Sequence, residues 1–347
     1  MFEGRRLAGD EALKAAGLTQ VTLEPKEDLA LINGTQLMTA VTGLALIDAQ
    51  RLARTADVGG AMTLDALQGT DVAFDQRIHD ARPHPGQVAS ARAVRQVLEG
   101  SALRASHLEC GEVQDAYSLR CMPQVHGAVR DALDHVQRVV SIEMNAATDN
   151  PMVFAESGDI VSGGNFHGQP VAIAADILAI AGAELGSISE RRTERLVNPA
   201  LSGLPAFLAR DGGLQSGLMM AHVTAAALVS ESKALAHPAS IDAIPTSAGK
   251  EDHVSMGVTA AHKAASIIAN TRQVLAIELV AAAEALEHRR PLRSSGALEA
   301  VHSLLRRHID ARETDRIVSP DIEAAARLID SGEILGAAEA VCGRLGA

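Results

Sequence analysis

Residues 267–286 read IIANTRQVLAIELVAAAEAL. On a helix, the apolar side chains of this stretch point in several directions rather than along one stripe. A helix that is apolar nearly all round lies inside a bundle, not on a protein surface. The same helical periodicity extends in both directions, so we predict one long buried helix over His253–Arg289.

Two further long helical patterns cover roughly Asp115–Asn145 and Gly168–Leu196, and another helix should run from Asn33-Gly34 to about Arg54. Pro123 should kink or delay the first of these, since proline lacks the N–H that a helix interior requires. Strand signals are limited to short hairpins, one in the first residues and one within the loop-like segment 148–166. The sequence therefore predicts an all-α fold, a single domain over residues 1–347 with a central bundle of long helices.

Composition narrows the class of function. The chain has 347 residues, 47% of them hydrophobic, a net charge of −12, 2% aromatic residues and no Trp. An acidic chain with few stacking side chains is a poor partner for nucleic acid. The most apolar run, Val171–Leu185, is interrupted by Asp176 and Glu184, and we interpret it as a buried helix rather than a membrane span. No signal peptide is visible, and we expect a cytoplasmic protein.

Cysteine usage agrees with a reducing compartment. Cys110, Cys121 and Cys342 form neither a CxxC pair nor an even framework. His107 and Cys110 are three residues apart, but no second pair with ligand spacing supports a metal site. We therefore expect no metal.

The segment Gln114-Asp115-Ala116-Tyr117-Ser118-Leu119-Arg120-Cys121 holds the only tyrosine of the chain, three residues before an arginine. That spacing places a phenol and a guanidinium on one face of a helix. A phenol can move a proton, and a guanidinium can hold a carboxylate through two hydrogen bonds. An enzyme that acts on an amino acid or another small carboxylate needs both functions close together. The simpler interpretation is a packed tyrosine beside a solvated arginine.

Four other segments combine polar residues with chain breaks, and each also has an ordinary structural explanation. Asn33-Gly34-Thr35-Gln36 could be a helix N-cap, Thr148–Pro151 an Asx turn, and Ser162–Gly168 a flexible connector. Glu251-Asp252-His253, within Gly249–Met256, could be a charged first helical turn, or its carboxylate could receive a cationic or imidazole substrate.

Taken in order, these segments resemble the histidine ammonia-lyases, a branch of the aromatic amino acid lyase family. The resemblance rests on INGTQ, QDAYSLR, ATDNP, SGGNFHG and EDHVSM, with SERRTERLVNP at Ser189–Pro199 in support. Any one motif is weak, but the ordered set covers nearly the whole chain. EDHVSM indicates histidine, because the phenylalanine and tyrosine lyases usually lack that Glu-Asp-His run.

The resemblance implies a reaction and a set of roles. Family members convert L-histidine to trans-urocanate and ammonia, using a methylidene-imidazolone (MIO) made from an internal Ala-Ser-Gly, in sites shared between the chains of a homotetramer. In the roles so implied, Asn33 supports the prosthetic group and the substrate, and Tyr117 lies over the reacting amine. Arg120 binds the carboxylate, and Gln114 and Phe166 line the pocket. Glu251 contacts the imidazole or assists proton transfer.

One departure from the family is large. No Ala-Ser-Gly occurs in the chain, and Gly249-Lys250 stands where many members carry Gln before the Glu. We expect the chain to correspond to the C-terminal portion of a family enzyme and to be inactive alone, since no residue here replaces the electrophile. A missing N-terminal fragment is one candidate partner that would complete it. One alternative is a non-catalytic helical oligomer or partner subunit of a split lyase. A less well supported alternative is a lyase of the fumarase and aspartase type, because Thr246–Lys250 resembles the signature of those enzymes only weakly.

Overall fold

The computed structural model describes residues 1–108 and 113–346. Two compact units emerge, one formed by Met1–Thr35 with Ala147–His167 and the other by Gln36–Ala146 with Gly168–Ala347. Cys110 lies outside the described residues. The single-domain organisation stays a prediction, and the two units are described in turn.

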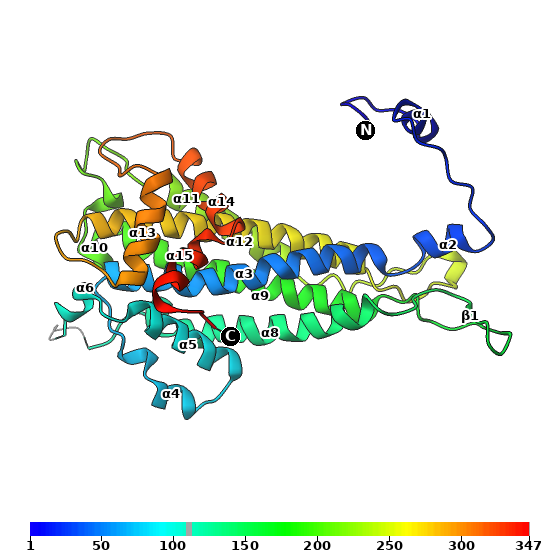
Figure 1. Ribbon diagram of the computed structural model, residues 1–347, viewed down its shortest axis with the longest axis horizontal. Coiled ribbons are helices and arrows are strands. Elements are labelled where there is room, and N and C mark those ends of the chain that lie inside the picture. Colours follow the sequence, from blue (N-terminus) through cyan, green and yellow to red (C-terminus); the bar gives the residue numbers. More distant parts are fainter. Residues whose placement is uncertain (109–112, 347) are drawn as a thin grey trace. The chain divides into compact units, whose positions relative to one another are not determined.

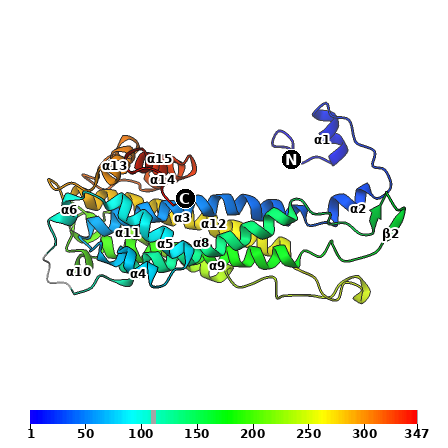
Figure 2. The ribbon, with the colours of Figure 1, turned by 60° about the horizontal axis from the view of Figure 1, so that its bottom comes forward.

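Four long helices form the core of the larger unit: α3 (Gln36–Ala66), α8 (Met122–Glu143), α9 (Gln169–Val197) and α12 (Gly257–Glu287). They run side by side in both views of the chain (Figures 1 and 2). Every residue of α12 from Val274 to Leu286 is buried, so this helix has no solvent face over its second half. The all-α class is confirmed, and so is the burial of the 267–286 stretch from Val274 onward. Ala269 is exposed, and the helix runs over Gly257–Glu287 rather than His253–Arg289.

Small residues let α9 and α12 approach closely. A Cβ built on Gly182 would lie 2.6 Å from Cδ1 of Ile268, closer than any real Cβ contact. The Thr271 hydroxyl donates to the carbonyl of Gly182 at 2.9 Å. Apolar surface buried at such a crossing contributes roughly 25 cal/mol per Å² to stability, and glycine is what permits the close approach.

Shorter elements cover the ends and sides of this bundle. In the larger unit they are η1 (Val72–Phe74), α4 (Gln76–Asp80), α5 (Pro85–Leu98), α6 (Ala102–Ala105), α7 (Tyr117–Arg120), α10 (Pro199–Ser202), η2 (Ala206–Leu208), α11 (Met219–Leu235), η3 (Ser247–Gly249), α13 (Gly296–His308), α14 (Ser319–Asp330) and α15 (Glu333–Cys342).

The smaller unit has little core of its own. It consists of α1 (Gly9–Ala15), α2 (Glu27–Ile32) and an antiparallel hairpin of β1 (Met152–Phe154) and β2 (Asp159–Val161), with Val153 opposite Ile160. The hairpin predicted within segment 148–166 is confirmed. Gly17, at φ +69°, follows α1 in the left-handed conformation that commonly ends a helix.

Several predicted boundaries were wrong. The 115–145 pattern is split into α7 and α8, because Cys121 leaves helical geometry (φ −101°, ψ 13°) just before Pro123. The helix after Asn33-Gly34 continues to Ala66 instead of Arg54, since tertiary packing outweighs the low helix propensity of Gly59 and Gly60. The Ser319-Pro320 pair, whose sequence is typical of an N-cap followed by a first helical residue, lies one position later, since α14 begins at Ser319 and its N-cap is Val318.

Three helical segments are long and apolar enough to cross a membrane by length and composition alone: Glu27–Ala66, Gln169–Val197 and Gly257–Glu287. The apolar run Val171–Leu185 belongs to the second of these, a 29-residue helix. In α9 and α12, 72% and 67% of the apolar window is buried inside the chain. α9 also holds buried Asp176, Glu190 and Arg192. Its apolar residues serve the bundle core.

Candidate active site

Tyr117 and Arg120 lie together on α7, as their spacing predicts. The Arg120 guanidinium carbon is 4.7 Å from the centroid of the Tyr117 ring, a cation–π arrangement. Leu119, only 2% exposed, anchors this short helix in the core, whereas Tyr117 is 71% exposed. The structure thus presents a phenol and a guanidinium side by side at the surface of one chain.

One hydrogen-bond donor of the Arg120 side chain is not used within the structure described. Its Nε atom is buried and finds no hydrogen-bond partner among the described residues. A buried N–H without an acceptor is costly. An incoming carboxylate would satisfy it, and guanidinium groups bind carboxylates in a bidentate manner.

Gln114 is exposed on the segment that leads into α7. It borders a cavity of about 840 Å³ whose lining also includes Asp115, Arg195 and Arg289. Asp115 accepts a hydrogen bond from the backbone N–H of Thr70 at 2.7 Å, which ties the segment to the end of α3. Gln114 is therefore near the Tyr117–Arg120 pair along the chain and faces a space that could take a small molecule.

Glu251 is exposed in the loop before α12. Its backbone pairs with Thr246, and hydrogen bonds from the hydroxyls of Thr246 and then Ser247 lower the pKa of its carboxyl below the usual value. The Glu251 side chain is thus an ionised acceptor, suited to a donor such as an imidazole N–H.

One chain does not bring Glu251 to the Tyr117–Arg120 pair. The start of α12 packs at Ala172 near the start of α9, since a Cβ on Gly257 would lie 3.4 Å from that of Ala172. The α7 backbone, in contrast, meets Arg192 near the end of α9. Twenty helical residues separate Ala172 from Arg192, which is about 30 Å along the axis. The two groups therefore occupy opposite ends of the same helix.

Asn33 and Phe166 belong to the smaller unit. Asn33 is the C-cap of α2, not the N-cap of a long helix, and its N–H donates to the carbonyl of Leu29 at 2.9 Å. Phe166 is half-buried. The Asn150 side chain accepts from the N–H of Gly163 at 2.7 Å, so the ATDNP and SGGNFHG segments contact each other.

The starts of α3, α9 and α12 meet at one end of the larger unit, with the Met38 sulfur between them. A Cβ on Gly168 or on Gly257 would lie 2.4 Å or 2.5 Å from this sulfur. Each helix N-terminus carries about half a positive charge, and three together favour an anionic or electron-accepting group. This end of the bundle therefore has a positive potential that would stabilise such a group.

A buried polar network runs beneath α7, and the sequence analysis did not assign it. It joins Asp57 of α3, His126 of α8, Arg192 of α9 and Glu278 of α12, each at most 1% exposed. Burial lowers the pKa of His126, although hydrogen bonding to Asp57 opposes that effect. Burial alone would raise the pKa of Asp57, but Arg130 and His126 lower it overall. The available signals were Glu278 inside an otherwise apolar stretch and Arg192 inside SERRTERLVNP.

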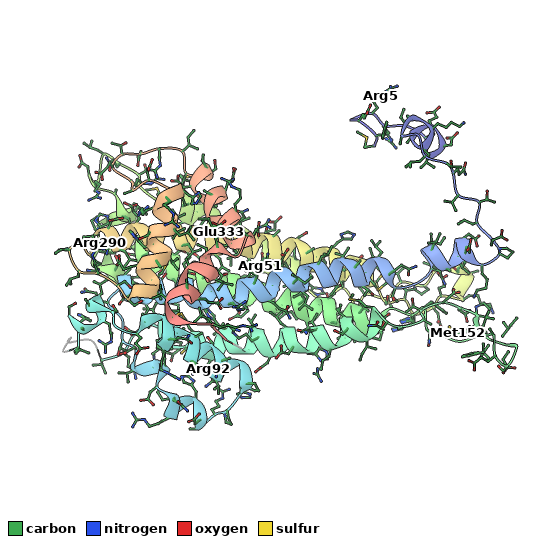
Figure 3. The ribbon with its side chains drawn as sticks, in the orientation of Figure 1. Arg5, Arg51, Arg92, Met152, Arg290 and Glu333 are labelled. Carbon is green, nitrogen blue, oxygen red and sulfur yellow. The ribbon has the colours of Figure 1, made fainter. Side chains whose placement is uncertain are left out.

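Among residues 1–108 and 113–346, no group of three His, Cys, Asp or Glu side chains could hold a metal ion. A cleft of about 1030 Å³ lies between α3, α5, α8 and α15, and it is lined by Arg51, Arg54, Arg92, Arg130 and Arg344 together with Asp134 and Glu339. Figure 3 marks two of these arginines, Arg51 on α3 and Arg92 on α5. This cleft is separate from the residues that the motifs single out.

Comparison with known proteins agrees with the motifs. Residues 1–307 match the aromatic amino acid lyase family. A histidine ammonia-lyase of Koribacter versatilis is 57% identical over 97% of this chain and 68% of its own length, and one of Symbiobacterium thermophilum is 56% identical over 99% and 68%. The crystal structure of a histidine ammonia-lyase from Trypanosoma cruzi superposes with a TM-score of 0.88 at 45% identity, covering 95% of this chain and 63% of that one. The chain spans about two thirds of the length of these proteins, and it belongs to the aromatic amino acid lyase family.

Proposed function

We propose that this chain carries part of a histidine ammonia-lyase, which removes ammonia from L-histidine without oxidation and leaves trans-urocanate. The observation that carries the proposal is the Tyr117–Arg120 pair, 4.7 Å apart, with an unsatisfied guanidinium N–H. The similarity to two histidine ammonia-lyases at 56–57% identity supports histidine as the substrate.

Each proposed residue has one task. Arg120 binds the α-carboxylate through its guanidinium and fixes the amino acid beside the ring of Tyr117. The Tyr117 hydroxyl lies over the amine and exchanges a proton with the departing nitrogen. Glu251, kept ionised by its hydroxyl neighbours, accepts the imidazole N–H or assists proton transfer. Gln114 and Phe166 line the pocket.

The MIO prosthetic group of the family forms from an internal Ala-Ser-Gly. No Ala-Ser-Gly is present, whereas the three helix starts around Met38 suit an electron-accepting group. The family resemblance assigns Asn33 a hydrogen bond to the group. When bound, the group supplies the electrophile that turns the amine into a leaving group.

We further propose a cytoplasmic homotetramer. Large apolar side chains are exposed along the central helices, among them Leu44 (68%), Ile47 (55%) and Ile142 (70%). Ile173 and Ile180 of α9 add to the same kind of surface. Soluble monomers rarely leave so much apolar area in contact with water. In such a tetramer, the Tyr117–Arg120 pair of one copy and Glu251 of another copy would together form one site.

The test is urocanate formation, followed by absorbance. The purified chain alone should bind L-histidine weakly and show no enzymatic turnover, because binding without differential stabilisation of the transition state does not accelerate chemistry. Addition of a separately expressed upstream segment that carries Ala-Ser-Gly should produce turnover, and a segment with Ala in place of that Ser is the matched control. Robust turnover by the chain alone would show that the argument from the electrophile is wrong.

A further inference from the structure

The short helix α7 has few attachments of its own. It contains four residues, and the non-helical geometry of Cys121 separates it from α8. Leu119 packs into the core beneath it. A further attachment comes from α9, whose Arg192 donates from Nη1 to the backbone carbonyl of Ser118 at 3.4 Å. Ser118 sits between Tyr117 and Leu119, so this contact reaches the middle of the segment that carries the proposed site.

Three central helices fix one edge of the Arg192 guanidinium. Its Nε and Nη2 donate to the two carboxylate oxygens of Glu278, at 2.5 and 2.9 Å, in a bidentate pair that is fully buried. The same carboxylate accepts the hydroxyls of Thr63 at 2.9 Å and Ser189 at 2.6 Å. Because Glu278 is held from α3 and α9 as well as from its own helix, the guanidinium plane has one orientation.

The other edge rests on His126. Its Nδ1 lies 2.8 Å from a carboxylate oxygen of Asp57, which can only accept, so Nδ1 carries the proton. In the neutral imidazole, Nε2 is then the acceptor for Arg192 Nη1, at 3.3 Å. Asp57 is itself fixed by Ser90 and Arg130, at 2.5 Å each. The guanidinium is thus wedged between two anchored groups, and Nη1 points at α7.

Stability alone does not account for this arrangement. A buried ion pair seldom stabilises a protein more than apolar side chains of the same volume would, because desolvation offsets the Coulomb attraction. A planar guanidinium with several donors does supply direction, which apolar packing supplies poorly. A missing side chain makes room for it, since a Cβ on Gly60 would lie 3.4 Å from Cζ of Arg192 and 2.3 Å from the sulfur of Met122.

We propose that Arg192, held by Glu278 and His126, is a positioning residue that fixes α7 and thereby sets the relative placement of Tyr117 and Arg120. The catalytic consequence rests on the proposed lyase function, whereas the positioning itself does not. Loss of Arg192 should therefore loosen α7 in any state of the protein, active or inactive.

The chain offers a direct probe, because Tyr117 is its only tyrosine. Labelling with 15N-tyrosine gives a single amide signal, which reports the order of α7. In the unaltered chain the order parameter should be close to the rigid-backbone value of about 0.85, and loss of the Arg192 contact should lower it below about 0.6.

Arg192→Met alone would leave the Glu278 charge buried and unpaired, so the primary variant is Arg192→Met with Glu278→Leu, which removes both charges. Arg192→Lys is the second variant, since lysine can keep a charge near Glu278 but cannot also reach Ser118. Arg191→Met, on the same helix and paired with Glu190, is the matched control and should leave the Tyr117 signal unchanged.

The expected result is a loosened α7 in both Arg192 variants, with unfolding midpoints near that of the control. An unchanged Tyr117 order parameter in the double variant would overturn the inference, because Leu119 alone would then hold α7. Equal loosening in Arg191→Met would also overturn it. Absence of urocanate formation after addition of the upstream segment, with α7 loosened as expected, would instead count against the lyase function and leave the positioning role standing.

Discussion

Gly127→Ala should destabilise the protein although alanine is the better helix former. Gly127 lies in α8 and faces Gly86 at the start of α5. A Cβ at position 127 would be 2.3 Å from the backbone nitrogen and 2.4 Å from the Cα of Gln87. An ordinary contact requires at least about 3.4 Å, so the two backbones must separate by about 1 Å. No side-chain rotation can relieve this clash, because the atoms involved are backbone.

The magnitude follows from two opposing terms. Alanine in a helix interior gains about 1 kcal/mol over glycine. Overpacking costs about 1–3 kcal/mol, and the upper value applies where both partners are backbone. Separation would also strain the 2.8 Å hydrogen bond from the N–H of Gly86 to Asp131, one turn further along α8. The net expected loss in the free energy of unfolding is about 2 kcal/mol.

Gly336→Ala is the matched control. Gly336 also lies inside a helix, α15, but a Cβ there would meet nothing within 4 Å. Only the propensity term applies, so this variant should gain about 0.5–1 kcal/mol. Urea unfolding followed by circular dichroism should separate the two variants by roughly 3 kcal/mol. A Gly127→Ala chain as stable as the parent would refute the inferred backbone contact between α5 and α8.

Three other predictions concern the site and its support. Arg120→Lys should weaken binding of L-histidine by about tenfold or more, because the bidentate donor is lost. Calorimetry measures this, and Arg307→Lys, at an exposed position on α13, is the control that should bind normally. The free energy of unfolding should fall as the pH drops below 6.5, the ordinary pKa of histidine, because the pKa of buried His126 is lowered in the folded chain and the unfolded chain takes up the proton first. The lowered pKa of Asp57 extends this loss of stability to stronger acid. In urea titrations, His126→Gln should flatten the part of the stability profile near the histidine pKa. Finally, Tyr117→Phe and Glu251→Gln chains can be mixed in equal amounts and assembled with the upstream segment. If each site takes these two residues from different copies, the mixture should recover about a quarter of the lyase activity. If both residues come from one copy, the mixture should recover none.

The sequence predicted the features that depend on local chemistry. The apolar stretch 267–286 indicated a buried helix because its pattern leaves no polar face, and Pro123 marked the break between α7 and α8 because proline cannot donate a helical hydrogen bond. The Tyr117–Arg120 pairing followed from helical spacing alone. These are relations between residues a few positions apart.

Relations between distant residues were missed for a physical reason. Arg192 meets Glu278 and His126 across 86 and 66 positions in the chain, and no local pattern specifies which helices will face one another. The full length of α3 was missed in the same way, since Gly59 and Gly60 read as helix breakers until α8, α9 and α12 pack against them. Asn33 is the C-cap of α2 rather than the N-cap of the long helix. The sequence pattern does not specify the turn between the two helices, which decides between these positions.

The geometry of α9 connects the fold to the proposed function. A straight helix of 29 residues holds the Tyr117–Arg120 pair near one end and the loop of Glu251 near the other. The α9 residues that meet these two parts of the chain, Arg192 and Ala172, are about 30 Å apart along the helix axis, whereas a substrate the size of an amino acid needs its binding groups within a few ångströms. A site that uses both must draw them from different copies of the chain. In the homotetramer that we propose, the exposed apolar residues on the central helices would form the contacts between copies. The positions of the proposed catalytic groups would then depend on bundle contacts between copies and, within each copy, on the guanidinium of Arg192 that holds α7.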